Sequence, residues 1–355
     1  MNEVELPKKN AFNFLRLICC IIVIYEHAIV LSGASFVCLG LRSIAVNVFF
    51  ILSGFWVTQS YFRSSSLKDY WVKRCKKILP QYFLVIFASI LFLSFFSSLP
   101  LKNYFFNKDV FKYFIANITT LNFIHPTLPG VFNGINDSAV NGSLWTIKIE
   151  IGFYIILPLI ILFSKKKKSS TVENNEGGYG CEVIIILYLL SVFYRATMPI
   201  ITERLQLPKS LINQLPAYIS YFVSGMFFAF YKNIITQKLN YFVLPCFISF
   251  IICFILNLHF IAVLVEPICL TVITLWLGYN LPFSEIGRKL DLSYSLYLVH
   301  YPIIMCGIDC GLFETHWFFS LLCVFGLSFL FSFFMESIQN RCFNKTMKNI
   351  NIEVK

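Results

Sequence analysis

The first apolar stretch of the chain carries an arginine and a histidine that could serve one reaction. Arg16 and His27 are eleven residues apart. On an α-helix, at about 100° per residue, they differ by roughly 20° in direction and lie about 16 Å apart along the axis. A neutral imidazole can take a proton from a hydroxyl near neutral pH, and a guanidinium can bind phosphate. The same residues could also be an arginine that reaches the membrane surface and a histidine hydrogen-bonded between helices.

Glu150 lies in a later apolar stretch, at a depth similar to that of His27. It is six residues into the stretch 144–163, which is about 9 Å from the start by the helical rise. His27 is four residues from the end of its own stretch. A carboxylate at that depth could orient or charge the imidazole. It could instead form a buried ion pair with Lys148 or Arg195.

Membrane-spanning helices must position these residues. The chain has 355 residues, of which 57% are hydrophobic and 13% charged, and its mean hydropathy is +0.72. These values exclude a water-soluble globule, a disordered chain and a secreted disulfide scaffold. A helix needs about 20 mostly apolar residues to cross a bilayer. Ten suitable stretches cover residues 14–31, 44–61, 81–99, 144–163, 183–202, 214–231, 241–258, 260–280, 292–311 and 317–338. We therefore expect an all-α integral membrane protein with about ten transmembrane helices.

The basic residues indicate how the chain is oriented. Of the 29 lysines and arginines, twenty fall on the side of the two termini and seven on the opposite side, with Arg195, in the later half of its stretch, counted among the seven. Arg16 and Lys148 lie within their stretches. By the positive-inside rule, both termini are cytoplasmic. We expect residues 1–340 to form the transmembrane domain and residues 341–355 a short basic cytoplasmic tail.

One predicted inward loop, between the second and third stretches, is dense in positive charge. Its members are Arg63, Lys68, Lys73, Arg74, Lys76 and Lys77. Such a cluster usually reflects only the orientation of the protein and its attraction to anionic lipid, and less often a phosphate site. On the opposite side, residues 100–143 form a candidate acceptor-facing surface, in which Asn117, Asn136 and Asn141 match the glycosylation sequon.

Two further polar positions fall nearer the middle of the membrane. These are Ser53 and His300, and the pair Ser53-Gly54 is most often a site of close helix packing. The five histidines are dispersed and the twelve cysteines form no paired CxxC pattern, so we expect no metal site.

Five blocks of sequence, in order over residues 13–303, resemble the membrane-bound acyltransferase 3 family, which includes bacterial O-antigen and capsule O-acetyltransferases. The blocks are Asn13-Phe14-Leu15-Arg16 followed by His27, NVFFILSGFWVTQSY at 47–61, WVKRCKKILPQY at 71–82, SLWTIKIEIGFYIILP at 143–158 and DLSYSLYLVHYPI at 291–303. The ten-helix layout extends the likeness over nearly the whole chain.

The resemblance implies functional residues. It implies that His27 is the catalytic histidine, that Arg16 is its partner in handling the donor, and that Glu150 is essential. The other positions that it implies are Ser53, Tyr297 and His300 in the pocket, and Arg16, Lys73, Arg74 and Lys77 in donor binding. Lys77 stands where the family pattern has a second arginine, so the positive charge is kept while the bidentate geometry is lost.

On this resemblance we expect a membrane O-acyltransferase that moves an acetyl (acyl) group from acetyl-CoA to a hydroxyl of a cell-surface polysaccharide or its lipid-linked precursor. Acetyl-CoA would be a substrate, and no bound cofactor is expected. The expected partners are acyl-CoA, a glycan or lipid-linked glycan acceptor and membrane lipids, without nucleic acid. The expected location is the bacterial inner (plasma) membrane, with several spans. A polysaccharide flippase or a glycan polymerase is the alternative, because scattered intramembrane charges suit these as well.

Overall fold

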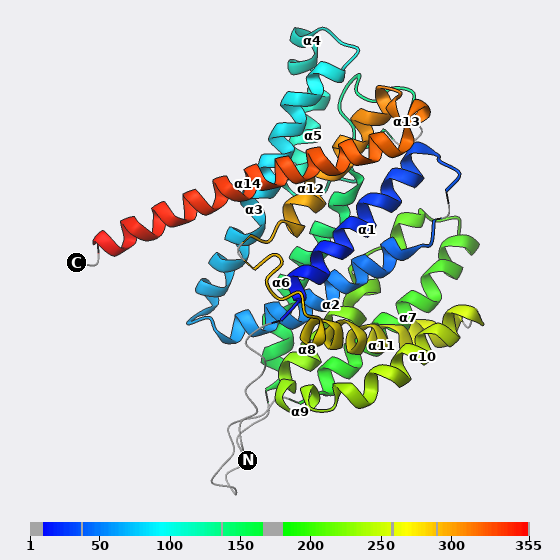
Figure 1. The fold of residues 1–355 in the computed structure, drawn as a ribbon, viewed down its shortest axis with the longest axis vertical. Helices are drawn as coiled ribbons and strands as arrows, with labels where there is room; N and C mark the ends of the chain where they lie inside the picture. Colours follow the sequence, from blue (N-terminus) through cyan, green and yellow to red (C-terminus); the bar gives the residue numbers. More distant parts are fainter. Residues whose placement is uncertain are drawn as a thin grey trace, which may run out of the picture. The chain divides into compact units, whose positions relative to one another are not determined.

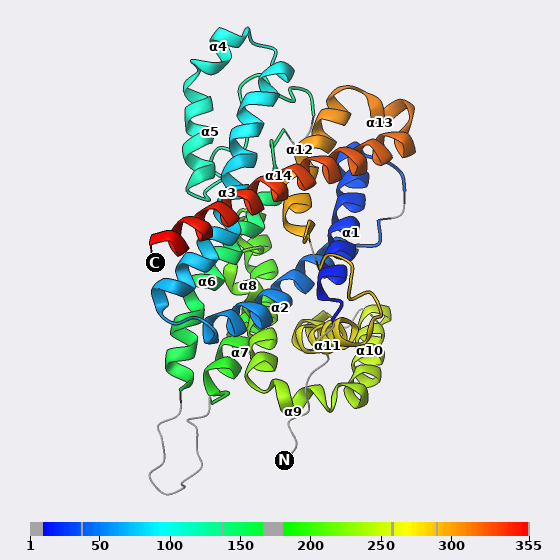
Figure 2. The same ribbon diagram turned by 60° about the vertical axis from the view of Figure 1, so that its left-hand side comes forward.

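The computed structural model describes residues 10–36, 38–135, 138–165, 180–256, 259–288 and 290–353, and these residues form helices and turns with no β-strand (Figures 1 and 2). Within them, seven helices are long and apolar enough to cross a membrane. They are α1 (Phe12–Ser32), α2 (Leu41–Phe62), α3 (Leu67–Phe92), α6 (Trp145–Ser164), α7 (Glu182–Arg204), α11 (His259–Asn280) and α14 (Trp317–Glu353). For the described residues, the prediction of an all-α fold with several helices able to span a membrane is confirmed.

The other three predicted stretches also contain helices, but shorter ones. α8 (Leu215–Phe230), α10 (Leu239–Ile255) and α12 (Ser293–Asp309) have 16, 17 and 17 residues. The smaller elements are η1 (Leu93–Phe96), α4 (Leu101–Phe105), α5 (Lys108–Ile118), η2 (Gly142–Leu144), η3 (Lys209–Leu211), α9 (Lys232–Thr236) and α13 (Leu312–Thr315). The predicted tail begins inside α14, and its last two residues lie outside the described part of the chain.

The basic cluster that was predicted as a loop is mostly helical. α3 begins at Leu67, and the side chain of Ser66 accepts a hydrogen bond from the backbone N–H of Asp69 at 3.1 Å, as a helix N-cap does. Lysine and arginine are good helix formers, and α3 continues through Pro80. The loop prediction is wrong from Leu67 onward, because charge was taken as the sign of a loop.

Four proline-containing helices are held by side chains that replace a lost backbone hydrogen bond. Proline has no N–H, so the carbonyl four residues earlier is left without its helical donor, which is costly in an apolar environment. The replacements are Gln339 Nε2 to Lys76 O for Pro80 (3.1 Å), Tyr70 Oη to Tyr154 O for Pro158 (3.0 Å), Arg195 Nη1 to Val263 O for Pro267 (3.3 Å) and Asn141 Nδ2 to Leu298 O for Pro302 (2.8 Å). Each bond fastens a helix to another segment of the same unit.

The chain divides into two compact units, each built from segments far apart in the sequence. The first unit comprises the chain up to Leu15, Val46–Tyr70 and Ile149–Ser284. The second comprises Arg16–Ala45, Trp71–Lys148 and the chain from Glu285 onward. Each unit therefore depends on long-range packing between helices.

In the first unit, α2 and α8 approach each other through two glycines. A Cβ on Gly54 would lie 2.0 Å from the carbonyl oxygen of Phe222, and one on Gly225 would lie 2.1 Å from that of Ile51. The two backbones touch because neither glycine has a side chain. This is the close packing through small residues that the pair Ser53-Gly54 predicts.

Candidate active site

His27 on α1 lies against His300 on α12 in the second unit. The Nδ1 atom of His27 is 2.9 Å from Nε2 of His300, and the rings stack with their centroids 5.1 Å apart. His300 is fully buried, and its Nδ1 lies 3.2 Å from the carbonyl oxygen of Leu296. His27 is only partly buried. A partly exposed imidazole is thus held through one of its nitrogens by a second, buried imidazole.

The turn before α6 is fastened to α12 beside this pair. The Asn141 side chain accepts hydrogen bonds from the backbone N–H and hydroxyl of Ser143, at 3.2 and 2.6 Å. The Ser143 hydroxyl also lies 3.3 Å from the carbonyl oxygen of Tyr297. The Tyr297 hydroxyl lies 3.1 Å from the Thr146 hydroxyl. The backbone turn that carries His300 is therefore held by buried polar contacts.

The sequons lie in structured parts of the molecule. Asn141 and Asn117 are both buried, and the Nδ2 atom of Asn117 donates to the carbonyl oxygen of Tyr113 at 2.8 Å. Asn136 lies outside the described residues. Asn117 and Asn141 hold the fold together and are not presented for modification.

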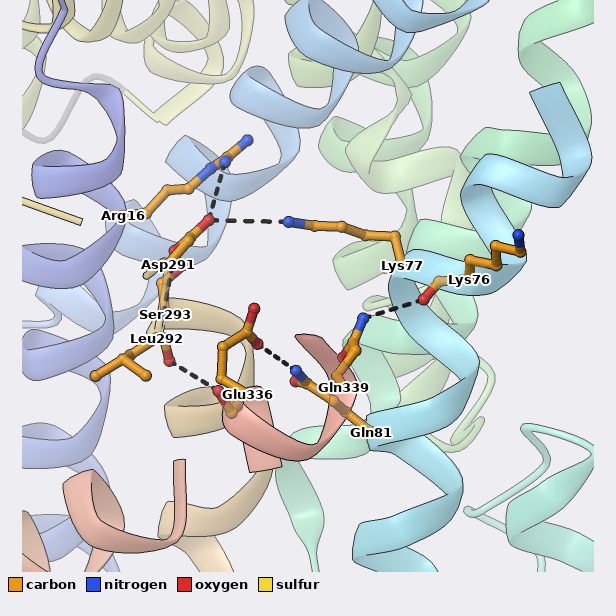
Figure 3. Close-up of polar contacts among 10 residues, drawn as sticks. Arg16, Lys76, Lys77, Gln81, Asp291, Leu292, Ser293, Glu336 and Gln339 are labelled. Atoms are coloured by element: carbon orange, nitrogen blue, oxygen red, sulfur yellow. Dashed lines mark hydrogen bonds and ion pairs between the residues drawn. The ribbon is translucent and has the colours of Figure 1, made fainter. Parts of the chain in front are cut away.

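Arg16, near the start of α1, faces a carboxylate just before α12. Its Nη1 atom is 3.5 Å from Oδ2 of Asp291, and the Nζ atom of Lys77, on α3, is 3.9 Å from the same oxygen (Figure 3). The other carboxylate oxygen accepts from the backbone N–H and the hydroxyl of Ser293, at 3.2 and 2.5 Å. Two cations from different helices therefore share one carboxylate that is itself anchored to the N-terminus of α12.

The charge of Asp291 is favoured by its neighbours. Burial alone would raise the pKa of this carboxyl, but Arg16, Lys77 and the hydrogen bonds from Ser293 together hold the pKa below its usual range. The side chains of Arg16 and Lys77 are 22% and 52% exposed, so both cations stay within reach of an added anion.

The helical form of the basic cluster brings three of its members together. Lys77 comes four residues after Lys73 and three after Arg74, so it neighbours both of them on one side of α3. On the same helix, Gln81 donates to Glu336 of α14 at 2.5 Å (Figure 3). α14 thus completes the polar cluster around the basic end of α3.

Glu150 and Ser53 form a pair in the first unit. The Ser53 hydroxyl donates to Oε1 of Glu150 at 2.8 Å. Arg195 and Lys148, the two cations that the sequence suggests as partners of Glu150, make contacts elsewhere. Arg195 forms an ion pair with Glu266 at 2.8 Å, and Lys148 lies over the Phe123 ring, 4.7 Å from its centroid.

The predicted site residues do not include two carboxylates that organise the second unit. Asp291 gives a signal, since an acidic residue two positions before Ser293 is typical of a helix N-terminus. Glu26 is 3% exposed and accepts hydrogen bonds from the backbone N–H groups of Leu41 and Arg42, at 2.8 and 2.9 Å. Its negative charge therefore caps the N-terminus of α2.

The arrangement can move a proton and hold an anion. The imidazole of His27 is suited to accept a proton, and Arg16 with Lys77 is suited to bind phosphate. Among the described residues, no group of three His, Cys, Asp or Glu side chains is placed to hold a metal ion.

Comparisons with known proteins agree with this chemistry. A family model described as an acyltransferase domain matches residues 9–336. Nodulation protein 10 of Rhizobium leguminosarum bv. viciae is 32% identical over 171 residues, which cover 45% of this chain and 46% of that protein. The O-acetyl transferase of Shigella phage Sf6 is 29% identical over 163 residues, which cover 42% and 45%.

More distant relatives match a shorter segment. The peptidoglycan O-acetyltransferase OatA of Listeria monocytogenes is 26% identical over 125 residues, which cover 34% of this chain and 20% of that protein. The matched segments therefore span less than half of each of these relatives. No solved structure matches the chain.

Proposed function

The chain belongs to the acyltransferase 3 family, whose model covers residues 9–336, and from this we propose that it is a membrane O-acetyltransferase acting from acetyl-CoA on a hydroxyl of a cell-surface polysaccharide or its lipid-linked precursor. Relatives named O-acetyl transferase support the acetyl group, and those named peptidoglycan O-acetyltransferase support a glycan acceptor. The observation that carries the proposal is the pair of contacts made by α1: His27 contacts a second imidazole, and Arg16 shares Asp291 with Lys77.

In the proposed reaction, His27 is the general base. A sugar hydroxyl is a poor nucleophile until its proton is removed. His27 takes that proton as the hydroxyl oxygen bonds to the carbonyl carbon of the acetyl thioester. The carbon–sulfur bond then breaks, and the imidazolium returns the proton to the sulfur, so that CoA leaves as a thiol. A positioned base contributes about 10²- to 10⁴-fold to such a step.

The phosphates of acetyl-CoA are proposed to bind at the other end of α1. Arg16 and Lys77 lie 3.5 and 3.9 Å from Asp291, whereas the partly buried pair Arg195–Glu266 is at 2.8 Å. Cations in such loose ion pairs can turn toward phosphate without losing a short bond. Lys73 and Arg74, on the same face of α3 as Lys77, would extend the site along the donor.

The other proposed functional residues, Ser53, Glu150 and Tyr297, take part in two further hydrogen bonds. In the first unit, Ser53 orients Glu150, and we assign both to the activity. In the second, Tyr297 contacts Thr146 beside the turn that carries His300. Loss of any of these side chains should lower transfer.

The proposed topology has ten spans, with both termini in the cytoplasm and the protein in the bacterial inner membrane. α8, α10 and α12 have 16 or 17 residues, which corresponds to about 24–26 Å by the helical rise, against a hydrocarbon core of about 30 Å. In this orientation Arg16 lies near the cytoplasm, where acetyl-CoA is found. His27 lies in the outer half, where a glycan hydroxyl would arrive.

The proposal is tested with purified protein in lipid nanodiscs, acetyl-CoA labelled in its acetyl group and surface glycan from a strain without this gene. The wild-type protein should label the glycan, and His27→Ala should not. His316→Ala is the matched control, since His316 is exposed, and it should label as the wild type does. Full labelling by His27→Ala would refute the assignment of the base. If the wild type moved glycan across the bilayer without labelling it, the protein would be a transporter.

A further inference from the structure

We propose that His300 is a positioning residue that decides which nitrogen of His27 acts as the base. This inference rests on the proposed acetyl transfer. It assigns the reactive lone pair to Nε2 of His27, and it follows from two hydrogen bonds in series: one between the two histidines and one from His300 to the backbone of its own helix.

The first step fixes the tautomer of His300. Its Nδ1 lies 3.2 Å from the carbonyl oxygen of Leu296. A carbonyl oxygen can only accept, so Nδ1 must carry the proton. His300 is 0% exposed, and a buried imidazole is held neutral because charge is costly there. A neutral ring has one N–H, which leaves a lone pair on Nε2 of His300.

The second step fixes the tautomer of His27. Its Nδ1 lies 2.9 Å from Nε2 of His300, the nitrogen that carries the lone pair. This nitrogen must therefore carry the proton, because two lone pairs at that distance would repel. The neutral ring of His27 then has its lone pair on Nε2, the nitrogen on the far side of the ring from His300. A histidine ring in water favours the opposite tautomer, so the contact reverses the intrinsic preference.

The same contact also supports the charged state that forms during the reaction. Once Nε2 of His27 has accepted a proton, both ring nitrogens carry hydrogen. The Nδ1–H group then donates a charge-assisted bond to His300, which is stronger than the neutral bond before it. His300 therefore takes the part that a carboxylate plays beside the histidine of a catalytic triad. The nearest carboxylate in the sequence, Glu26, is already bonded to the N-terminus of α2.

The turn of α12 around His300 is held in place independently of His27. Asn141 donates to the carbonyl oxygen of Leu298, and the Ser143 hydroxyl lies 3.3 Å from the carbonyl oxygen of Tyr297. His300 is thus a rigid partner, which is what a residue needs in order to select one tautomer of a more accessible ring.

Two substitutions separate the two hydrogen bonds of His300. The amide of His300→Asn overlies the Nδ1 position, so it can keep the bond to Leu296 but cannot reach His27. The amide of His300→Gln overlies the Nε2 position, and its oxygen can accept from Nδ1 of His27. We expect His300→Asn to lower kcat by about 10- to 100-fold, part of the about 10²- to 10⁴-fold that a general base supplies, with KM for acetyl-CoA unchanged. His300→Gln should recover most of that loss, and His316→Asn should match the wild type.

The ¹⁵N chemical shifts of the His27 ring report its tautomer directly, without reference to activity. In protein labelled with ¹⁵N-histidine, the ring nitrogen shifts of His27, identified by their loss in His27→Asn, should show hydrogen on Nδ1. In His300→Asn they should move toward hydrogen on Nε2. Hydrogen on Nε2 in the wild type, or the same His27 signals in both proteins, would overturn the inference. The wild-type spectrum decides the matter even if His300→Asn does not fold. Absence of transfer by the wild type would instead refute the proposed function.

Discussion

The substitution Gly54→Ala should separate two helices that now touch. The added Cβ would lie 2.0 Å from the carbonyl oxygen of Phe222, whereas ordinary contact begins at 3.4 Å. The backbones of α2 and α8 must therefore move apart locally by about 1.4 Å, the difference between these distances. Because the position of a Cβ is fixed by its own backbone and the Phe222 oxygen belongs to a backbone, no rotamer change can relieve the clash. Overpacking of this kind costs about 1–3 kcal/mol, and Gly225→Ala, on the facing helix, should cost a similar amount.

The chain offers a matched control for this prediction. Gly326 lies within α14, and a Cβ there would meet nothing within 4 Å. Gly326→Ala should be neutral or stabilising by up to about 1 kcal/mol, since alanine is the better helix former. The assay is thermal unfolding of the three variants in one detergent, with Tm read from intrinsic fluorescence. If the Tm of Gly54→Ala equalled the Tm values of the wild type and of Gly326→Ala, the close approach of α2 and α8 would be refuted.

Three further outcomes follow from polar contacts. Gln339→Leu should lower stability by about 1–3 kcal/mol, since it removes the part-buried hydrogen bond to the carbonyl of Lys76. In a Pro80→Ala background, where the helix supplies its own N–H, the same change should cost less. Equal costs in a double-mutant cycle of Tm values would count against the contact. Arg195→Gln should destabilise by about 1–3 kcal/mol, because the partly buried Glu266 loses its 2.8 Å ion pair. Adding Glu266→Gln should recover part of the loss in a denaturation series. The pKa of Asp291 is depressed, so its carboxylate should stabilise the folded protein above the ordinary carboxyl range, and this stabilisation should be lost as the pH falls through the depressed pKa. A plot of Tm against pH should therefore be flatter for Asp291→Asn than for the wild type. Parallel plots for the two proteins would contradict this.

Much of the fold could be predicted from the sequence because lipid imposes a simple requirement. Each of the ten apolar stretches contains a helix, since a backbone in hydrocarbon must satisfy its own hydrogen bonds. The start of α3 could not be predicted, because Pro80 and the charges before it looked like a boundary. The helix continues with the help of Gln339, more than 250 residues away, which donates to the carbonyl of Lys76 where Pro80 has no N–H to offer.

The partners of the candidate site residues were harder to predict than the residues themselves. Helical spacing places Arg16 and His27 on one face of α1, and the structure gives each a partner near α12. The sequence placed His300 only at a depth nearer the middle of the membrane, and the structure shows its Nε2 atom 2.9 Å from Nδ1 of His27. Which helices become neighbours depends on packing across the whole unit, and a single sequence does not contain that information in local form.

The assignment of His27 as the base is tested most directly by single-turnover transfer of acetyl from acetyl-CoA, measured beside the Kd for acetyl-CoA, in the wild type and in His27→Gln. The account predicts that the rate of His27→Gln falls by about 10²- to 10⁴-fold while its Kd stays at the wild-type value. Transfer by His27→Gln at the wild-type rate would contradict it.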